Sequence, residues 1–216
     1  MIINGSYFVG DIYLPQVGSG ASAIANNNDL LERYIKEYEP KILKKGLGSR
    51  LYNELEGNLN SDGSLKESAE QKWNDLLNGK EYTKNDITYY WRGIVDDHGS
   101  YKKSFIAYYV FYWYIKKNNT ALTTLGAVKP QAENAEAVSP VQVLTDAWRE
   151  FHEWYSGSNS STSANAYYHK GFYVEDWFGG NDNSKEVSLY TFLSDNKDDY
   201  PNWNFTNVEN KTSWGL

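Results

Sequence analysis

The stretch YKKSFIAYYVFYWYIKK, from Tyr101 to Lys117, organises the predicted fold. Eleven consecutive residues from Phe105 to Ile115 are apolar or aromatic, and pairs of lysines flank the run. The run is shorter than the roughly 20 apolar residues that span a bilayer, and it is longer than a typical strand. Because no Gly or Pro interrupts it, we expect a helix that is buried on most sides, with the other helices packed around it. A strand is the alternative, since Tyr, Val, Phe and Trp also favour strands.

The composition indicates one domain of ordinary size that can form a substantial core. The chain has 216 residues, 40% of them hydrophobic, and its 19 Tyr and 8 Trp exceed what a core needs, which suggests contact surfaces. Because there is no cysteine, disulfides, thiolate catalysis and cysteine-bound zinc are excluded. The first residues lack the basic and apolar regions of a signal peptide, so we expect a soluble protein made in a cytoplasm.

The net charge of −7 is unevenly distributed. Residues 150–216 hold 10 acidic and 4 basic side chains, whereas residues 1–149 hold 18 acidic and 17 basic ones. A general nucleic-acid-binding protein would be basic. The acidic third is therefore either a solvated face or a wall that repels DNA instead of holding it.

Residues 1–27 predict an extended N-terminal arm. Segments rich in Ile, Val, Tyr and Phe are separated by glycines and show no helical period before Pro15. An isolated strand leaves its backbone groups unpaired, so the arm has to join a sheet of its own or of a neighbouring molecule. We expect a strand that pairs with another chain, formed by Tyr7, Phe8, Ile12 and Tyr13.

Residues 28–156 predict a mainly helical core. Asn28 or Asp29 fits a helix N-cap, with Glu32 in position for a capping box. Pro40 ends or kinks this helix, or starts the next one in its first turn. Further on, two glycines form an elbow between two short helical pieces. These glycines are Gly46 and Gly48.

Three more helices and a short hairpin follow from the pattern. A helix is expected from Ser68 to Leu77, a β-hairpin or irregular crossing between residues 78 and 94, a helix starting at Pro140 with Ser139 as its cap, and a short helix from Val187 to Leu193. The buried positions expected in these helices are Trp73, Leu76 and Leu77, and then Val143, Leu144, Ala147, Trp148, Phe151 and Trp154.

Two segments depart from the helical pattern. Residues 118–138 contain no aromatic residue in an otherwise aromatic chain, and we expect a protruding loop that contacts a partner. Residues 157–216 begin with a Gly/Ser-rich linker and continue as an aromatic, acidic C-terminal extension that packs on the core.

The chain lacks the sequence motifs of common catalytic and metal sites. No phosphate-binding loop, dinucleotide fingerprint or GxSxG elbow occurs. Asp96, Asp97 and His98 are adjacent, and neighbouring side chains diverge instead of converging on one metal. His152 has no second histidine at the spacing of a zinc protease, His169 lies among tyrosines, and carboxylate pairs such as Glu175 and Asp176 arise by chance in an acidic chain. We therefore predict no catalytic, metal or cofactor site.

Four stretches resemble a known family of proteins. They are YEPKILKKGLGSRLYNEL (Tyr38–Leu55), KWNDLLNGKEYT with YWRGI (within Lys72–Ile94), GAVKPQAENAEAVSPVQVLTDAWREF (Gly126–Phe151) and LYTFLSDNKDDYPNW (Leu189–Trp203). In order and spacing they resemble the head–tail connector, adaptor or neck ring proteins of tailed phages that infect Bacteroidetes, crAss-like phages included. The N-terminal arm and residues 157–182 fall outside this resemblance.

The resemblance implies a structural virion protein without enzymatic activity or cofactors. Such a subunit would be mainly α, a helical bundle around the aromatic helix with minor β structure. It would form a homo-oligomeric ring, expected to be a dodecamer, that attaches to the portal protein, extends the channel for passing genomic DNA and docks the next tail component. It would bind neither specific DNA sequences nor a membrane. The expected location is the virion neck, between capsid and tail, after synthesis in the bacterial host cytoplasm.

The residues expected at the inter-subunit or portal interface come from the arm and the protruding loop. Ring subunits have two different faces to bury, which suits surplus aromatic residues. The alternative function is a non-catalytic carbohydrate-binding module that uses surface Trp and Tyr. Glycoside hydrolysis is a third and weaker hypothesis. The expected interface residues are Tyr7, Phe8, Ile12 and Tyr13 in the arm, and Leu125, Val128, Lys129, Glu133, Asn134 and Val138 in the loop.

Overall fold

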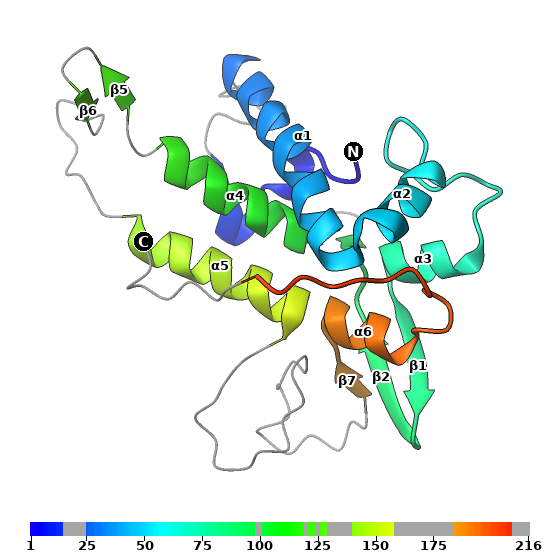
Figure 1. Cartoon of the computed structure of the whole chain (residues 1–216). Coiled ribbons are helices and arrows are strands. Elements are labelled where there is room, and N and C mark those ends of the chain that lie inside the picture. The colour runs from blue at the N-terminus through cyan, green and yellow to red at the C-terminus, as the bar shows by residue number, and fades with distance from the viewer. Residues whose placement is uncertain are drawn as a thin grey trace, which may run out of the picture.

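The computed structural model describes residues 1–14, 25–97, 101–118, 121–123, 126–128, 140–157 and 184–208. The fold is mainly α with minor β structure, as predicted (Figure 1). The helices are α1 (Ala25–Leu47), α2 (Ser49–Gly57), α3 (Gln71–Asn78), α4 (Phe105–Asn118), α5 (Val141–Ser156) and α6 (Leu189–Asp195), with two 3-10 turns, η1 (Gly5–Tyr7) and η2 (Gly10–Ile12). The strands are β1 (Lys80–Lys84), β2 (Ile87–Trp91), β3 (Val95–Asp97), β4 (Lys102–Ser104), β5 (Ala121–Thr123), β6 (Gly126–Val128) and β7 (Ser184–Glu186).

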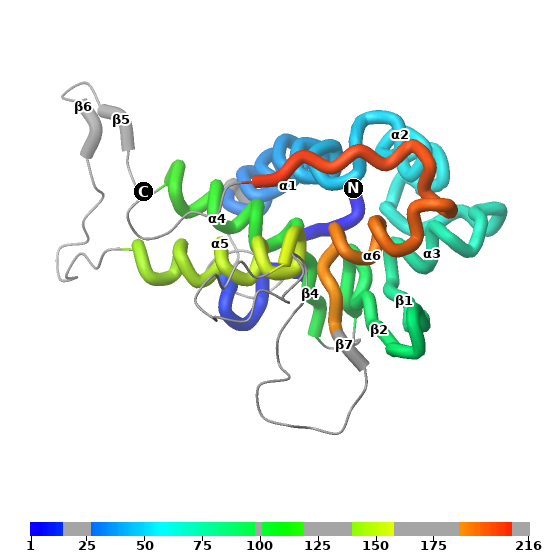
Figure 2. Tube along the Cα trace, turned by 60° about the horizontal axis from the view of Figure 1, so that its bottom comes forward, coloured from blue at the N-terminus to red at the C-terminus, as the bar shows by residue number. Residues whose placement is uncertain are grey.

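Helix α4 is the predicted central helix. It lies between α1 and α5 in both views (Figures 1 and 2), and its first eight residues are all buried. The prediction that the helix begins at Tyr101 is wrong, because Lys102–Ser104 pair with Val95–Asp97 as a short antiparallel ladder. The Ser104 hydroxyl accepts a hydrogen bond from the Ile106 amide at 3.2 Å, as an N-cap does, and donates to the Ile94 carbonyl at 2.8 Å. The helix therefore begins where the apolar run begins, at Phe105, with Ser104 as the polar residue at its N-terminal boundary.

An aromatic layer joins α4 to α5. The closest ring pair is Tyr112 and Trp148, with centroids 4.5 Å apart, and Tyr109 lies 5.1 Å from Phe151. The predicted α5 stripe is confirmed except at Val143, which is 47% exposed because it lies on the outer side of the first turn. Pro140 occupies the N-cap position instead of the first helical position, and Ser139 lies outside the described residues. The confirmed buried residues are Leu144, Ala147, Trp148, Phe151 and Trp154.

Helix α1 is longer than predicted. It begins by Ala25, so the N-cap expected at Asn28 or Asp29 is wrong, and it continues through Pro40 without a break. A proline inside a helix leaves the carbonyl four residues earlier without its partner. That residue is Lys36, which is exposed, so water can satisfy the carbonyl.

The elbow between α1 and α2 falls at one of the two predicted glycines. Gly48 has a φ of 80°, which L-residues with a side chain rarely adopt, and it separates the helices. Gly46 stays helical, and a Cβ atom there would lie 2.9 Å from side-chain atoms of both Leu189 and Tyr155. The first glycine therefore permits close packing, and the second makes the turn.

The predicted β-hairpin is present as β1 and β2. Asn85 and Asp86 connect the strands with φ values of 54° and 61°, the backbone of a type I′ turn. Strand β7, far away in the sequence, adds to β2 in parallel, which gives the order β1-β2-β7. Helix α3 before the hairpin is three residues shorter at its start than predicted, while Trp73, Leu76 and Leu77 are buried as expected.

Residues Tyr200–Val208 form a C-terminal strap across the elbow (Figure 2). The amide of Thr206 donates to the Lys45 carbonyl at 2.7 Å, and the amide of Asn204 donates to the Leu47 carbonyl at 3.1 Å. The indole of Trp203 donates to the Gly46 carbonyl at 2.9 Å. The last carbonyls of a helix have no partner within it, so the strap acts as the C-cap of α1.

Substituting Gly48 should test this arrangement. We expect Gly48→Ala to lower the free energy of unfolding by about 1–3 kcal/mol, because it adds a left-handed backbone penalty and brings a Cβ atom to 3.0 Å from the Asn204 carbonyl oxygen of the strap. Urea unfolding measures the change. Gly57→Ala is the matched control, because a Cβ atom there meets nothing within 4 Å. An equal effect at both glycines would contradict the role of the elbow.

Candidate interaction surface

The N-terminal arm is anchored to α1 by a buried carboxylate. The two oxygens of Glu39 accept hydrogen bonds from the amides of Ile2 and Ile3 at 2.8 and 3.0 Å. On the other side, Gly63 has a φ of 90°, and its Cα lies so close to the Met1 carbonyl that a side chain would collide with it. The start of the arm is therefore held between α1 and the loop that precedes α3.

The prediction that the arm forms an extended strand is wrong, whereas its pairing with another chain stays a prediction. The arm folds into the turns η1 and η2, and Tyr7, Phe8 and Ile12 are buried in the core of their own chain. Gly5 and Gly10 open the two turns, and Gly10 has a φ of 59°. Of the four expected interface residues of the arm, only Tyr13 remains accessible to another molecule, with 59% of its surface exposed.

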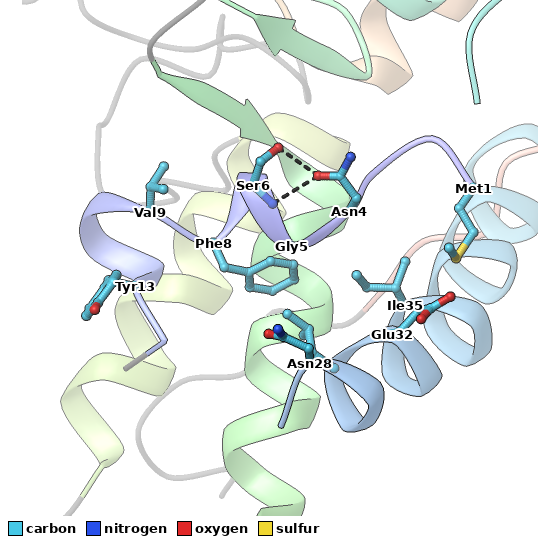
Figure 3. Close-up of a pocket in the computed structure, with 11 residues that line it drawn as sticks. Met1, Asn4, Gly5, Ser6, Phe8, Val9, Tyr13, Asn28, Glu32 and Ile35 are labelled. Carbon is cyan, nitrogen blue, oxygen red and sulfur yellow. Dashed lines mark hydrogen bonds between the residues drawn. The ribbon is translucent and has the colours of Figure 1, made fainter. Parts of the chain in front are cut away.

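A groove of about 640 Å³ lies between the arm and the N-terminal half of α1 (Figure 3). Its volume is in the range of small-molecule and peptide sites. Phe8, Leu31 and Ile35 provide an apolar floor, whereas Glu32 at the edge is paired with Lys36 at 2.7 Å. The groove can therefore accept an apolar side chain or segment. Its lining consists of Met1, Asn4, Gly5, Ser6, Phe8, Val9, Tyr13, Asn28, Leu31, Glu32 and Ile35.

A smaller cavity of about 280 Å³ lies behind Glu39. Burial raises the pKa of Glu39, while the hydrogen bonds from Ile3 and Ile2 and the amino group of Met1 oppose that rise. Burial, together with the neighbouring Glu56 carboxylate, also raises the pKa of Tyr52 to about 12. A raised carboxyl pKa means that the folded chain takes up this proton at a higher pH than the unfolded chain. The free-energy cost of burying the charged Glu39 carboxylate is therefore lost as the pH falls through the pKa of Glu39 in the folded state.

Val128 is the one expected interface residue of the loop that falls within the described residues. Val128 lies in β6, which pairs with β5 in a two-stranded ladder. Leu125, Lys129, Glu133, Asn134 and Val138 lie outside the described residues. The expected role of the loop therefore stays a prediction.

The part of the chain that the structure describes offers no metal centre. No group of three His, Cys, Asp or Glu residues is placed to hold an ion there. Asp97 pairs with Lys102 at 2.6 Å across β3 and β4. His98, His169 and the Glu175–Asp176 pair lie outside the described residues.

His152 has a structural environment. It is buried in α5, and because a carbonyl only accepts, its Nε2–H donates to the Val208 carbonyl of the strap at 3.1 Å. Burial lowers the pKa of His152 below its usual value, although hydrogen bonds involving Val208 and Gly157 oppose this change. The neutral imidazole thus ties the end of the strap to α5.

The folded state should lose stability on mild acidification because of His152. An unfolded chain protonates this histidine near pH 6.5, whereas the folded chain protonates it only at lower pH. The stabilisation is complete above about pH 6.5 and is lost as the pH falls through the folded pKa. Urea unfolding between pH 5 and 8 should show a steeper decline for the wild type than for His152→Gln. If stability falls equally with pH in the wild type and in His152→Gln, His152 is not the cause of the pH dependence.

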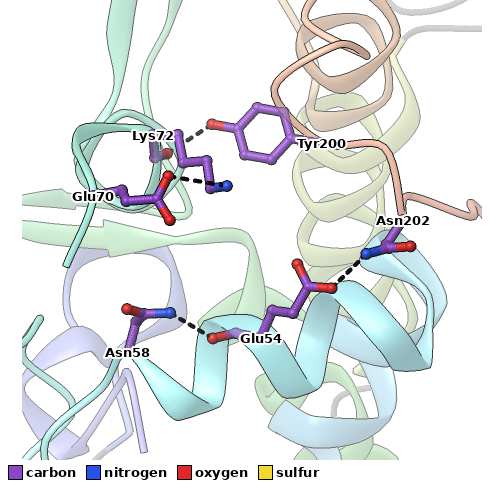
Figure 4. Close-up of polar contacts among 6 residues, drawn as sticks. All are labelled: Glu54, Asn58, Glu70, Lys72, Tyr200 and Asn202. Carbon is purple, nitrogen blue, oxygen red and sulfur yellow. Dashed lines mark hydrogen bonds and ion pairs between the residues drawn. The ribbon is translucent and has the colours of Figure 1, made fainter.

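Polar contacts connect the stretches that carry the family resemblance (Figure 4). The Tyr200 hydroxyl donates to the Lys72 carbonyl at 2.7 Å, and the Asn202 amide donates to the Glu54 carboxylate at 2.5 Å. Asn58 closes α2 by donating to the Glu54 carbonyl at 2.8 Å, and Lys72 pairs with Glu70 at 3.3 Å. Sequence reasoning missed this convergence, because the partners lie 128 and 148 positions apart.

One family model matches the sequence, over residues 43–147 and 183–213, which together make up more than half of the chain. It is described as a family of unknown function (DUF6712). The chain belongs to this family. No curated protein and no solved structure matches the chain.

The two segments matched by the DUF6712 model meet at the elbow. The first begins in the last turns of α1 and contains the carbonyls that the strap caps, and the second contains β7, α6 and the strap. Every residue that lines the groove precedes Leu43 and therefore lies outside the match. The match thus covers the elbow, the strap and the elements between them, while the arm and most of α1 precede it. In the described residues, no helix is long and apolar enough to cross a membrane.

Proposed function

We propose that this protein is a structural subunit of the virion neck, part of a connector ring between the portal and the next tail component. The observation that carries the proposal is the convergence of the resembling stretches on the elbow and strap. The first, second and fourth stretches supply these contacts, and the third, Gly126–Phe151, ends in α5 against α4. The resemblance therefore extends over one folded body.

The burial of these residues supports a structural role over an enzymatic one. Leu51, Trp73, Trp91 and Tyr200 of the resembling stretches are all buried and serve packing. The groove is lined by residues that all precede the resembling stretches, whereas the smaller cavity includes Glu39, Leu43, Tyr52 and Leu55 of the first stretch. The buried packing residues of the resembling stretches support a structural role.

The carbohydrate-binding alternative requires exposed aromatic platforms. Of the described tryptophans, Trp73, Trp91, Trp148 and Trp154 are buried, and Trp113 and Trp203 are half-buried. Trp177 and Trp214 lie outside the described residues. No described tryptophan is therefore an exposed platform, and the exposed aromatic residues of the described part are tyrosines, namely Tyr13, Tyr90 and Tyr101.

Light scattering with negative-stain imaging, on the protein alone and mixed with the portal of the same virus, tests the proposal. We expect rings, either alone or on the portal. Tyr13→Ser should reduce ring yield by about tenfold, as expected for an aromatic contact residue worth 1–2 kcal/mol. Tyr90→Ser, at a tyrosine that is 40% exposed on β2, is the matched control. A protein that stays monomeric and does not bind the portal would overturn the connector proposal.

A further inference from the structure

The arm and the surface beneath it form a complementary pair. Five arm residues are inserted into the body, and each is at most 6% exposed. The Glu39 carboxylate holds the start of the arm, and the ring of Tyr7 lies under the Lys102 ammonium at 5.8 Å. The inserted residues are Ile3, Tyr7, Phe8, Ile12 and Leu14.

The contacts between arm and body do not depend on which chain supplies the arm. Only the ten residues between Leu14 and Ala25 tie the arm to its own body. Fully extended, such a connection spans at most about 35 Å. Tyr13, one residue before the end of the arm, is 59% exposed, so a chain can enter or leave the site there.

We propose that the arm site is also an intermolecular receptor, in which residues 1–14 of a second copy replace the resident arm. Exchange of an identical element conserves every arm–body contact and changes only the tether, so it is a low-cost route to association. The inference rests on the proposed ring, in which a neighbouring copy is held nearby and its arm has a millimolar effective concentration.

Site-specific crosslinking can detect the exchange, because the chain contains no cysteine. Asp11 is exposed next to Gly10, whose Cα faces the hydroxyl of Tyr101. Asp11→Cys on one copy and Tyr101→Cys on another should therefore be joined by a short bis-maleimide when the arm is exchanged. Tyr90→Cys in place of Tyr101→Cys is the exposed control on β2.

The crosslinking is carried out on rings assembled from an equimolar mixture of the two single variants, and on rings of the double variant. We expect covalent dimers in the mixture at a yield at least tenfold above the Tyr90→Cys control. If the double variant forms an intramolecular crosslink and the mixture forms no covalent dimers, the proposed exchange is wrong, whereas the proposed ring is unaffected. Covalent dimers in a preparation without rings would support the exchange and count against the ring.

Discussion

Trp148→Ala should lower the free energy of unfolding by about 3–5 kcal/mol, the usual cost of removing a large buried aromatic side chain. Trp148 is 1% exposed, and its ring contacts Tyr112 and Phe151 at centroid distances of 4.5 and 5.0 Å. The substitution leaves a cavity in the layer that joins α4 to α5. Urea unfolding followed by circular dichroism measures the change.

Val143→Ala provides the control on the same helix. Because Val143 is 47% exposed, its truncation should change the free energy of unfolding by less than about 0.5 kcal/mol. If both variants lost a similar amount of unfolding free energy, α5 would have to pack through a different face. The pair therefore tests both the central layer and the boundary of the α5 stripe.

Glu39→Leu should release the arm while the helical body stays folded. The substitution leaves the amides of Ile2 and Ile3 without acceptors, at about 1–3 kcal/mol for each buried group that stays unsatisfied. The helical body should stay folded, because the two hydrogen bonds that the substitution removes are made to the arm. Hydrogen exchange of the arm amides should thus accelerate about 10- to 100-fold with little change in the urea midpoint.

Glu37→Leu is the matched control two positions away. Glu37 is exposed and pairs with Lys41 across one turn of α1, and a solvent-screened pair of this kind contributes little to stability. Arm exchange in this variant should equal that of the wild type. If Glu39→Leu instead unfolded the whole chain at lower urea, the arm and the body would form one cooperative unit. The arm could then not exchange between copies without global unfolding.

The arm shows why its packing could be predicted only in part. Its apolar residues marked it as a segment that must be buried, and the sequence places glycines at positions 5 and 10. Whether the arm is buried on its own body or on another molecule depends on Glu39 and on the surface of α1, α4 and β4. These partners are distant in sequence, and no local pattern encodes them. The same holds for the groove, whose two walls lie on either side of Pro15.

The elements that the sequence determined by itself are those stabilised by neighbours along the chain. The unbroken apolar run became α4, residues 78–94, expected as a hairpin or an irregular crossing, became the hairpin of β1 and β2, and the spacing of Leu144, Ala147 and Trp148 set the buried face of α5. Local period and turn chemistry suffice for such elements.

Only the tertiary structure decided the remaining contacts. These are the inward packing of the arm, the parallel addition of β7 to β2, and the strap that caps α1 through Lys45 and Leu47. Each joins segments separated by tens to more than a hundred residues, and each satisfies backbone groups that the local sequence leaves unpaired. Their free energy comes from burial and from hydrogen bonds that exist only once the body has folded, so they have no signature in a short window of sequence.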